Sequence, residues 1–442
     1  MTDIEQADFF TDAAVTSDPY PYFDALRTRC PVHPVAHPTV VAVTGYDEAM
    51  TVYRDNHSFS SCNAIAGPFP PLPVEPGAND ITDVIEQHRG SLPLSNDIIT
   101  MDGDVHEIER MLLRQIMTPR GLKENEAALA AIADRCIDSF LDKGVCELIS
   151  EYAKPFSTLV IADMLGMPDD DCEEIRAVLL GRDDVGVVGT EEGLHANPLE
   201  EMFHKFKSYV EDRRRNPRHD VLTHLATTTY SDGTMPDVDA VVRHAAFIFG
   251  AGQDTTARMI GAALRIVGEN PALQDLLRAE RDRIPNFIEE VLRLESPVMS
   301  DFRLTRRSTS IAGVQIPAGT TVMLHPGAAN RDPRRFDDPH EFRLGRENGR
   351  EHMAFGRGQH TCPGSALARA EGRVTIERFL DRTTDIAISE SHHGPSGGRR
   401  YNYDPTYILR GLSDLHITFT PAARTDDPTA APGGLAAAGD AK

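Results

Sequence analysis

A glycine-rich stretch near the C-terminus holds the residues best suited to chemistry. It runs from Phe355 to Gly364 and reads F-G-R-G-Q-H-T-C-P-G. A helical pattern over Ser365–Leu380 begins directly after Cys362, so the positive end of that helix and its free N–H groups favour a thiolate. A thiolate in such a loop can approach a flat metal macrocycle closely. The alternative is a buried, inert cysteine in a turn, a common fate of a lone cysteine.

The strongest helical pattern spans residues 238–267, where apolar side chains recur with a 3.6-residue period. Gly250 and Gly252 each weaken this helix by about 1 kcal/mol relative to alanine. Thr255 can bond back to a carbonyl one turn earlier and bend the helix. We therefore expect a local opening that makes room for small ligands or water. Packing glycines beside a surface Asp254 are the alternative.

Two further pairs have the spacing of neighbours on one helix face. Glu290 and Arg293 are three residues apart, and His106 and Arg110 are four apart. Taken singly, such a pair is usually a surface ion pair or a set of solvated side chains.

Taken together, these motifs resemble those of the cytochrome P450 family. The stretch around Cys362 matches the haem-binding signature F-G-x-G-x-H-x-C-x-G at all six fixed positions. Ala251–Thr256 resembles the family's A-G-x-D-T-T segment, and Glu290–Arg293 resembles its E-x-x-R. The motifs occur in the family's order, and the resemblance covers roughly residues 18–420. It implies the P450 fold, which is mainly α with a small mixed β region.

The resemblance implies roles for individual residues. Cys362 would ligate the haem iron as a thiolate, and Asp254 and Thr255 would relay protons to bound oxygen. The other residues expected to bind the cofactor are His106, Arg110, Arg303 and His360, which would hold the haem propionates, and Phe355 in the cysteine loop.

The resemblance also implies structural support and a substrate pocket. Arg335 precedes a phenylalanine in a later segment and would complete a buried triad with Glu290 and Arg293. The segments that line the pocket in the family predict an apolar pocket formed by Ile65, Ala66, Phe249, Val298, Met299, Phe302, Ile408 and Leu409.

The implied reaction inserts one oxygen atom of O₂ into an apolar small molecule, with haem b (iron protoporphyrin IX) as the cofactor. The sequence has no flavin motif after a strand and no cysteine set for an iron–sulfur cluster, so a separate ferredoxin and ferredoxin reductase are expected. A peroxide-dependent haem-thiolate enzyme and a non-catalytic haem- or ligand-binding protein are the alternatives.

The net charge of the segment around the cysteine loop indicates which kind of redox partner could bind there. From Arg331 to Arg378 there are 10 Arg, no Lys and 8 acidic residues, a local net charge of +2. A basic face around the cysteine loop would steer an acidic partner, and merely solvated arginines are the alternative.

Composition excludes several other classes of protein. The 442 residues include 45 Lys plus Arg and 68 Asp plus Glu, so the net charge is −23, which disfavours nucleic acid. The N-terminus does not resemble a secretory signal, and no apolar run approaches the roughly 18 residues of a membrane span. Six cysteines without a C-x-x-C argue against a disulfide scaffold or a structural zinc site. We expect a cytoplasmic protein.

The elements that must position these residues are mostly helices. We expect one P450 domain over residues 1–420 and a disordered Ala/Pro/Gly-rich tail over 421–442. Residues 1–38 and the Pro-rich segment 67–76 are predicted to be loops. Besides those above, helices are predicted at about 104–117, 122–142, 149–165, 170–180, 199–215 and 285–294, strands at 39–43 and 415–419, and a hairpin over 311–324 that turns at Ile316–Gly319.

Overall fold

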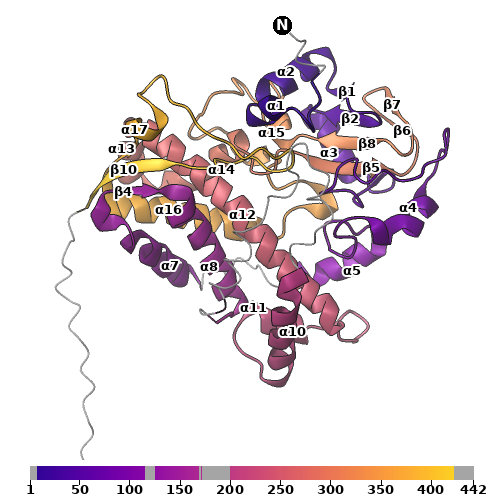
Figure 1. The fold of residues 1–442 in the computed structure, drawn as a ribbon, viewed down its shortest axis with the longest axis horizontal. Helices are drawn as coiled ribbons and strands as arrows, with labels where there is room; N and C mark the ends of the chain where they lie inside the picture. The colour runs from indigo at the N-terminus through magenta and orange to yellow at the C-terminus, as the bar shows by residue number, and fades with distance from the viewer. Residues whose placement is uncertain (1–6, 115–124, 169–170, 172–199, 423–442) are drawn as a thin grey trace, which may run out of the picture.

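The structure is a computed structural model that describes residues 7–114, 125–168, 171 and 200–422. Helices dominate it, and a five-stranded sheet lies at the upper right of Figure 1. The predicted helix 170–180 falls almost wholly outside the described residues. No helix within the described ranges is long and apolar enough to cross a membrane.

The helices are named in chain order. They are α1 (Ala13–Ser17), α2 (Tyr20–Arg29), α3 (Tyr46–Arg54), α4 (Thr82–His88), α5 (Gly103–Arg114), α7 (Glu126–Asp138), α8 (Lys154–Leu165), α10 (Glu200–Arg215), α11 (Val221–Thr227), α12 (Val238–Glu269), α13 (Pro271–Ala279), α14 (Ile284–Leu294), α15 (Pro326–Ala329), α16 (Ser365–Arg382) and α17 (Glu390–His393).

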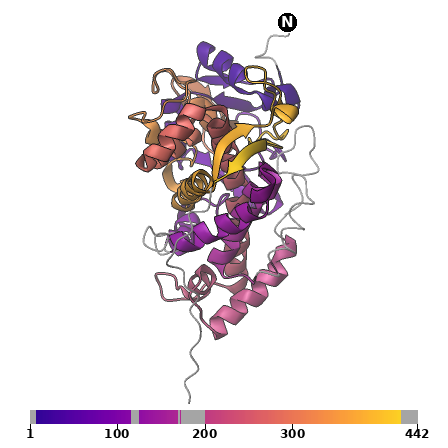
Figure 2. The same ribbon diagram turned by 90° about the vertical axis from the view of Figure 1, so that its left-hand side faces the viewer.

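The strands form three sheets. They are β1 (Val32–Pro34), β2 (Val40–Val43), β3 (Phe59–Ser60), β4 (Val145–Glu147), β5 (Asp301–Thr305), β6 (Thr309–Ile311), β7 (Val314–Ile316), β8 (Thr321–Leu324), β9 (Thr383–Ile388) and β10 (His416–Pro421). The largest sheet has the order β1-β2-β8-β5-β3, the second has the order β4-β10-β9, and β6 pairs with β7. In Figure 2 the yellow strands of the second sheet lie above the purple helices.

The long helix α12 crosses the molecule (Figure 1) and contributes many side chains to the largest apolar cluster of the core. It is helical throughout its 32 residues, so the expected local opening is not present. The Thr255 hydroxyl does bond back to the Ala251 carbonyl, at 3.0 Å, as predicted. A Cβ at Gly252 would lie 2.7 Å from Cδ1 of Ile161. The glycine therefore allows α8 to pack closely on α12, which explains its presence without a break.

The N-terminal region is more regular than predicted. Residues 13–29 form α1 and α2, and β1 follows. The prolines at the start of α2 suggested a loop, but proline is tolerated in the first turn of a helix, where its missing N–H has no helical partner. Tyr22, Phe23 and Leu26 are buried, so packing stabilises α2.

The predicted hairpin has a different turn. The turn joins β6 to β7 through Ala312 and Gly313, whose φ angles are 47° and 84°. Two consecutive positive φ values suit a tight two-residue hairpin. Ile316 ends β7, and residues 317–320 lead into β8, which pairs with β5 and, in parallel, with β2.

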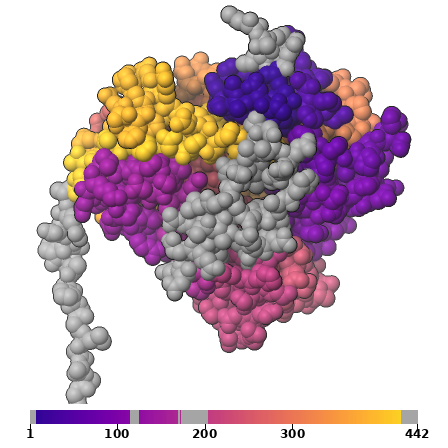
Figure 3. Space-filling view, viewed as in Figure 1, coloured from indigo at the N-terminus to yellow at the C-terminus, as the bar shows by residue number. Residues whose placement is uncertain are grey.

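The N-terminal helices and the hairpin that precedes β10 meet in space. On the face drawn in Figure 3, the indigo N-terminal and yellow C-terminal regions are adjacent. Arg410 stacks over the ring of Tyr20, 5.1 Å from its centroid. The first two residues of the predicted tail are described, and Pro421 belongs to β10. Residues 423–442 lie outside the described part of the chain. The Pro-rich segment 67–76 forms no helix or strand, as predicted.

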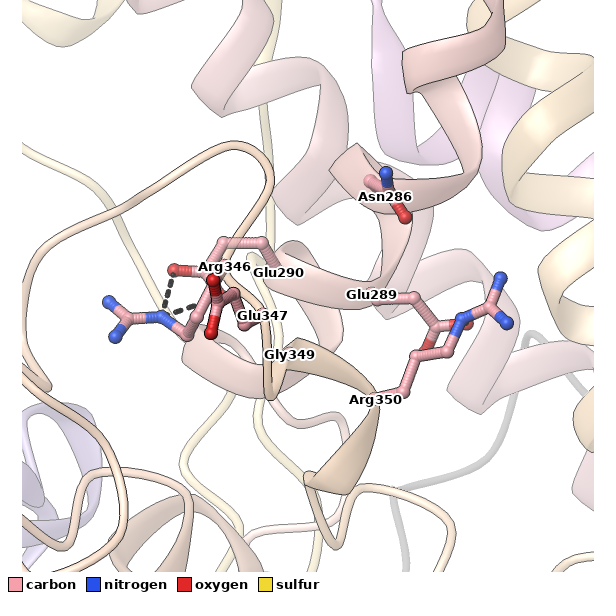
Figure 4. Close-up of a pocket in the computed structure, with 7 residues that line it drawn as sticks. All are labelled: Asn286, Glu289, Glu290, Arg346, Glu347, Gly349 and Arg350. Atoms are coloured by element: carbon pink, nitrogen blue, oxygen red, sulfur yellow. Dashed lines mark hydrogen bonds and ion pairs between the residues drawn. The ribbon is translucent and has the colours of Figure 1, made fainter.

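The buried ion cluster of α14 differs from the predicted triad. Arg293 Nε and Nη2 each donate to the Glu290 carboxylate at 2.8 Å, and both side chains are buried. The third member is Arg346, whose Nε lies 3.1 Å from Glu290 Oε1 (Figure 4). Arg335 is half-exposed and pairs with Glu351. Its neighbour Phe336 takes the inward position, under Arg293.

This cluster predicts unequal effects of two arginine substitutions. Arg346→Ala should lower the free energy of unfolding by about 1.5–3 kcal/mol, as expected for buried hydrogen bonds to a charged group. Arg335→Ala, the matched control, removes a half-exposed ion pair and should cost under about 1 kcal/mol. Denaturant unfolding of both variants measures the difference. A larger loss in Arg335→Ala would contradict the assignment.

Candidate functional site

The loop that carries Cys362 is fixed by its backbone. The Cys362 amide donates to the Phe355 carbonyl at 2.8 Å, and α16 begins three residues later. Gly358 has a φ of 72°, and a Cβ there would lie 2.1 Å from the carbonyl oxygen of Tyr53 in α3. Only glycine fits both the conformation and the contact. The loop therefore holds the thiol in one place.

The thiol has competing electrostatic influences. Burial raises the pKa of Cys362, while hydrogen bonds from the Gly364 and Ser365 amides and the charges of Arg110 and Arg369 act in the opposite direction. Burial dominates, so the helix terminus alone does not yield the thiolate expected from the sequence. A bound metal ion deprotonates a coordinating thiol outright. Among the described residues, no three or more His, Cys, Asp or Glu side chains gather to hold a metal ion, so an ion here would take its other ligands from a bound group.

Phe355 and Arg369 brace the loop from the side of α16. The Arg369 guanidinium lies 4.5 Å from the centroid of the Phe355 ring. Its Nε donates to Glu289 at 2.7 Å, and the ring of His352 also bonds Glu289, at 3.0 Å. Burial alone would raise the pKa of Glu289, but these hydrogen bonds lower it to about 2.

The four predicted carboxylate-binding side chains come together beside the loop. The rings of His106 and His360 lie 4.0 Å apart, and Arg110 donates to the Thr361 carbonyl. Burial lowers the pKa of His360 well below its usual value, and the charges of Arg303, His106 and Arg110 lower it further. Arg303 is also paired with Asp301, at 2.7 Å. A cluster this rich in donors beside one thiol fits a cofactor with carboxylate groups, such as haem.

A stripe of accessible residues runs along the middle of the otherwise buried α12. The accessible residues are Arg243, Phe247 and residues 250–255; Gly252 and Gln253 pack on α8, and the others recur at helical spacing. Accessibility in the middle of a helix that crosses the molecule shows that the packed core leaves this face uncovered. Phe249 is not on this face: it is fully buried and packs on Phe206 of α10, with ring centroids 6.1 Å apart. It lies about 200° around the helix from Ala251, and its place in the pocket stays a prediction.

Asp254 and Thr255 differ in their local partners. Arg258 Nε donates to Asp254 Oδ2 at 3.0 Å, and Arg258 is itself buried. Thr255 is held by its bond to the Ala251 carbonyl. The two side chains are adjacent on a regular helix, so they do not form one site through an opening of the backbone.

The other predicted pocket segments do converge. Val298 and Leu409 face each other in an antiparallel bridge, and the Met299 amide donates to the Ile408 carbonyl at 2.8 Å. The Phe302 amide lies 3.3 Å from the carbonyl of residue 64, which brings the 64–67 loop alongside. The predicted residues divide into two groups by burial. Ile65, Val298 and Leu409 are partly exposed, whereas Ala66, Met299, Phe302 and Ile408 are buried.

The sequence analysis did not predict the buried acid Glu371. Glu371 on α16 is 1% exposed and contacts the hydroxyl of Thr256 on α12. Burial raises its pKa to about 8, so the carboxyl carries its proton at neutral pH. The signal was present: Glu371 lies between Leu367 and Val374 on the apolar face of its helix. A single acid in an apolar stripe is a sign of a buried polar contact.

Comparisons with known proteins agree with this arrangement. The sequence model of the family described as Cytochrome P450 matches residues 194–384. Cytochrome P450 144 of Mycobacterium tuberculosis is 30% identical over 434 residues, which are 94% of this chain and 92% of the relative. The solved structure of Mycobacterium marinum cytochrome P450 CYP150A6 in the substrate-free form is 56% identical, with a TM-score of 0.88 and coverage of 95% of this chain and 100% of the other.

A second solved structure, cytochrome P450 CYP109Q5 from Chondromyces apiculatus, is 28% identical, with a TM-score of 0.79 over 95% of this chain and all of the other. These matches confirm the predicted fold, mainly α with a small mixed β region. The chain therefore belongs to the cytochrome P450 family, whose members bind haem and are oxidoreductases, typically haem-thiolate monooxygenases.

Proposed function

We propose that this chain is a haem b monooxygenase that inserts one oxygen atom from O₂ into an apolar small molecule, with electrons from a separate ferredoxin-type partner. The observation that carries the proposal is the single thiol of Cys362, fixed by a loop that requires glycine at 358, beside a cluster of four carboxylate-binding side chains. When bound there, haem supplies the activation of O₂, and thiolate donation favours O–O cleavage.

The chain's own residues would hold the cofactor without covalent attachment to the macrocycle. Cys362 would ligate the iron through its sulfur, and His106, Arg110, Arg303 and His360 would bind the propionates. Covalent c-type attachment uses a C-x-x-C-H motif. The sequence has no C-x-x-C, which supports the b type.

Asp254 and Thr255 would supply protons from α12. Asp254 is partly exposed, with 28% of its side chain accessible, so solvent can reach its carboxylate. The Thr255 hydroxyl donates to a carbonyl of the same helix and retains its oxygen as an acceptor toward the accessible stripe. In this role Asp254 would take a proton from water and release it toward the site, and the Thr255 hydroxyl would accept a proton at its oxygen as it donates its own, so both groups return to their starting forms.

The substrate would be apolar because, besides Arg243, Asp254 and Thr255, the accessible residues of this region are apolar. Ile65, Val298 and Leu409 come from the converging loops, and Phe247 and Ala251 come from α12. Phe247 would line the pocket from α12, since it is partly exposed whereas Phe249 is buried.

The proposed basic face for the redox partner is smaller than the arginine count suggested. Arg357 donates to the carbonyls of Glu351 and His352, both at 2.6 Å, and Arg369 is paired with Glu289. Arg350 also lies near Glu289, with its Nε 3.7 Å from Oε1, but its side chain is 73% exposed and its carbonyl lies beside Arg357 of the cysteine loop. We therefore assign the contact with an acidic partner to Arg350.

The thiolate assignment is tested by replacing single cysteines. Cys362→Ser should remove the red-shifted Soret band of the reduced carbon-monoxide complex, because serine does not provide the sulfur ligand. Cys62→Ser, the control, alters a buried thiol whose pKa burial raises to about 11 and should keep the band. The reverse pattern would show that Cys362 is not the ligand.

The proton assignment is tested on α12. Asp254→Asn should slow turnover by up to the ~10²–10⁴-fold typical of general acid–base groups, and Thr255→Ala should release more peroxide for each product formed. Asp239→Asn changes an exposed acid on the same helix and should have no effect. NAD(P)H, peroxide and product are measured together. Wild-type rate and coupling in both test variants would refute the assignment.

The partner contact is tested by charge reversal. Arg350→Glu should slow reduction by a ferredoxin system, and the difference from wild type should shrink as salt screens exposed charges over about 10 Å at 0.1 M. Arg218→Glu makes the same change of net charge at the exposed Arg218, just beyond α10. Stopped-flow reduction compares the two. Equal rates in the two variants would count against a basic docking site at Arg350.

A further inference from the structure

Glu109 on α5 is bonded to two other parts of the chain. His244 Nε2 of α12 lies 2.6 Å from Glu109 Oε2, and the imidazole donates because a carboxylate only accepts. The hydroxyl of Tyr230, between α11 and α12, donates to Glu109 Oε1 at 2.9 Å. The side chains of His244 and Glu109 are 4% and 15% exposed. Each carboxylate oxygen therefore has its own partner in a site largely shielded from water.

These partners keep the Glu109 carboxylate charged. Burial acts to raise the pKa of Glu109, but the hydrogen bonds from His244 and Tyr230 and the charges of His244 and Arg243 outweigh it, so the pKa lies below its usual value. Hydrogen bonds to a charged group are stronger and shorter than those between neutral groups. Glu109 is therefore tied firmly to α12 and to the segment before it.

The neighbours of Glu109 on α5 belong to the cofactor cluster. Consecutive residues of a helix point about 100° apart. Arg110, the next residue, donates to the Thr361 carbonyl of the cysteine loop, and the His106 ring, one turn earlier, lies 4.0 Å from the ring of His360. Helix α5 thus meets α12 through Glu109 and the cysteine loop through Arg110. Its rotation about its own axis decides where His106 and Arg110 lie.

The outward face of α5 does little to set that rotation. Val105, Ile108 and Met111 recur there at three-residue spacing, and they are 58%, 41% and 39% exposed. Leu112 and Leu113 are buried and anchor the helix, but apolar packing is not directional. A hydrogen bond, in contrast, weakens steeply when its angle changes. The two bonds of Glu109 therefore give α5 a directional contact with α12.

We propose that Glu109 is a positioning residue for the cofactor: by fixing the rotation of α5 against α12, it holds His106 and Arg110 toward the haem propionates. The inference rests on the proposed role of those two side chains and deepens it. The carboxylate of Glu109 is engaged by His244 and Tyr230, so its effect on the cofactor passes through the helix.

The first test is the rate at which the holoprotein releases haem to an acceptor such as apomyoglobin, followed by absorbance. Glu109→Leu removes both acceptor oxygens and should accelerate release by about 5- to 30-fold, the effect of one or two kcal/mol. Glu109→Gln keeps one acceptor oxygen in a side chain of similar shape and should recover part of the loss. Asp104→Asn, the matched control, alters an exposed acid in the first turn of α5 and should release haem at the wild-type rate. Wild-type release in Glu109→Leu, or no recovery with glutamine, would overturn the proposal.

A modified cofactor separates positioning from a general loosening of the fold. The dimethyl ester of haem lacks the charged propionates that His106 and Arg110 would bind. In protein reconstituted with this ester, Glu109→Leu should change the rate of release much less than it does with haem. Equal acceleration for both cofactors would show that the variant loosens the whole protein, and the proposal would be wrong.

A milder variant tests the same contact from outside α5. Tyr230→Phe removes one hydrogen bond at a partly exposed ring and should accelerate haem release by a smaller factor than Glu109→Leu. In the Glu109→Leu background the same change should have no further effect, because its partner is already absent. An equal effect in both backgrounds would contradict a role through Glu109.

The two proposals fail differently. If the wild type releases haem and its dimethyl ester equally fast, the cluster does not bind propionates, and the proposed cofactor site and this inference fail together. If the wild type holds haem longer than the ester but Glu109→Leu releases haem at the wild-type rate, only the role of Glu109 is wrong.

Discussion

The site depends on a close approach between two stretches of backbone. Gly358 of the cysteine loop lies against the Tyr53 carbonyl of α3, where no side chain fits. Because the chain turns at this point, the Cys362 amide meets the Phe355 carbonyl and α16 starts directly afterwards. The His360 ring is brought to His106 by the same turn. The position of the thiol is thus a consequence of backbone packing, and its protonation state depends on what it binds.

Helix α14 ties this loop to the rest of the molecule through three acids. Glu289 binds Arg369 beside the cysteine loop, and Glu290 binds the buried arginines of its own helix and of the loop segment before the cysteine. Glu295, just after the helix, binds Arg265 of α12 at 3.1 Å and Arg410 of the C-terminal hairpin at 2.8 Å. Because these pairs are largely buried, removing one partner would leave the other charge uncompensated away from water. The contacts therefore fix the relative positions of the segments that surround the site.

The sequence predicted the site best where spacing alone determines a contact. The cysteine loop and the His106–Arg110 pair depend on local geometry, and their side chains meet beside the thiol. Arg335 failed because the path of an irregular segment decides which of several arginines turns inward. Phe249 packs against α10, and its 3.6-residue period could not show this, because the period identifies the faces of a helix and not the neighbour of each face. Both cases concern orientation, which only tertiary packing fixes.

X-ray absorption at the iron edge of the purified holoprotein shows which atoms bind the iron. If Cys362 ligates the iron as proposed, the spectrum should require one sulfur scatterer beside the nitrogens of the macrocycle. The same measurement on Cys362→Ser should lose that scatterer. A wild-type spectrum fitted by nitrogen and oxygen alone, or a sulfur scatterer that persists in Cys362→Ser, would contradict the ligation by Cys362.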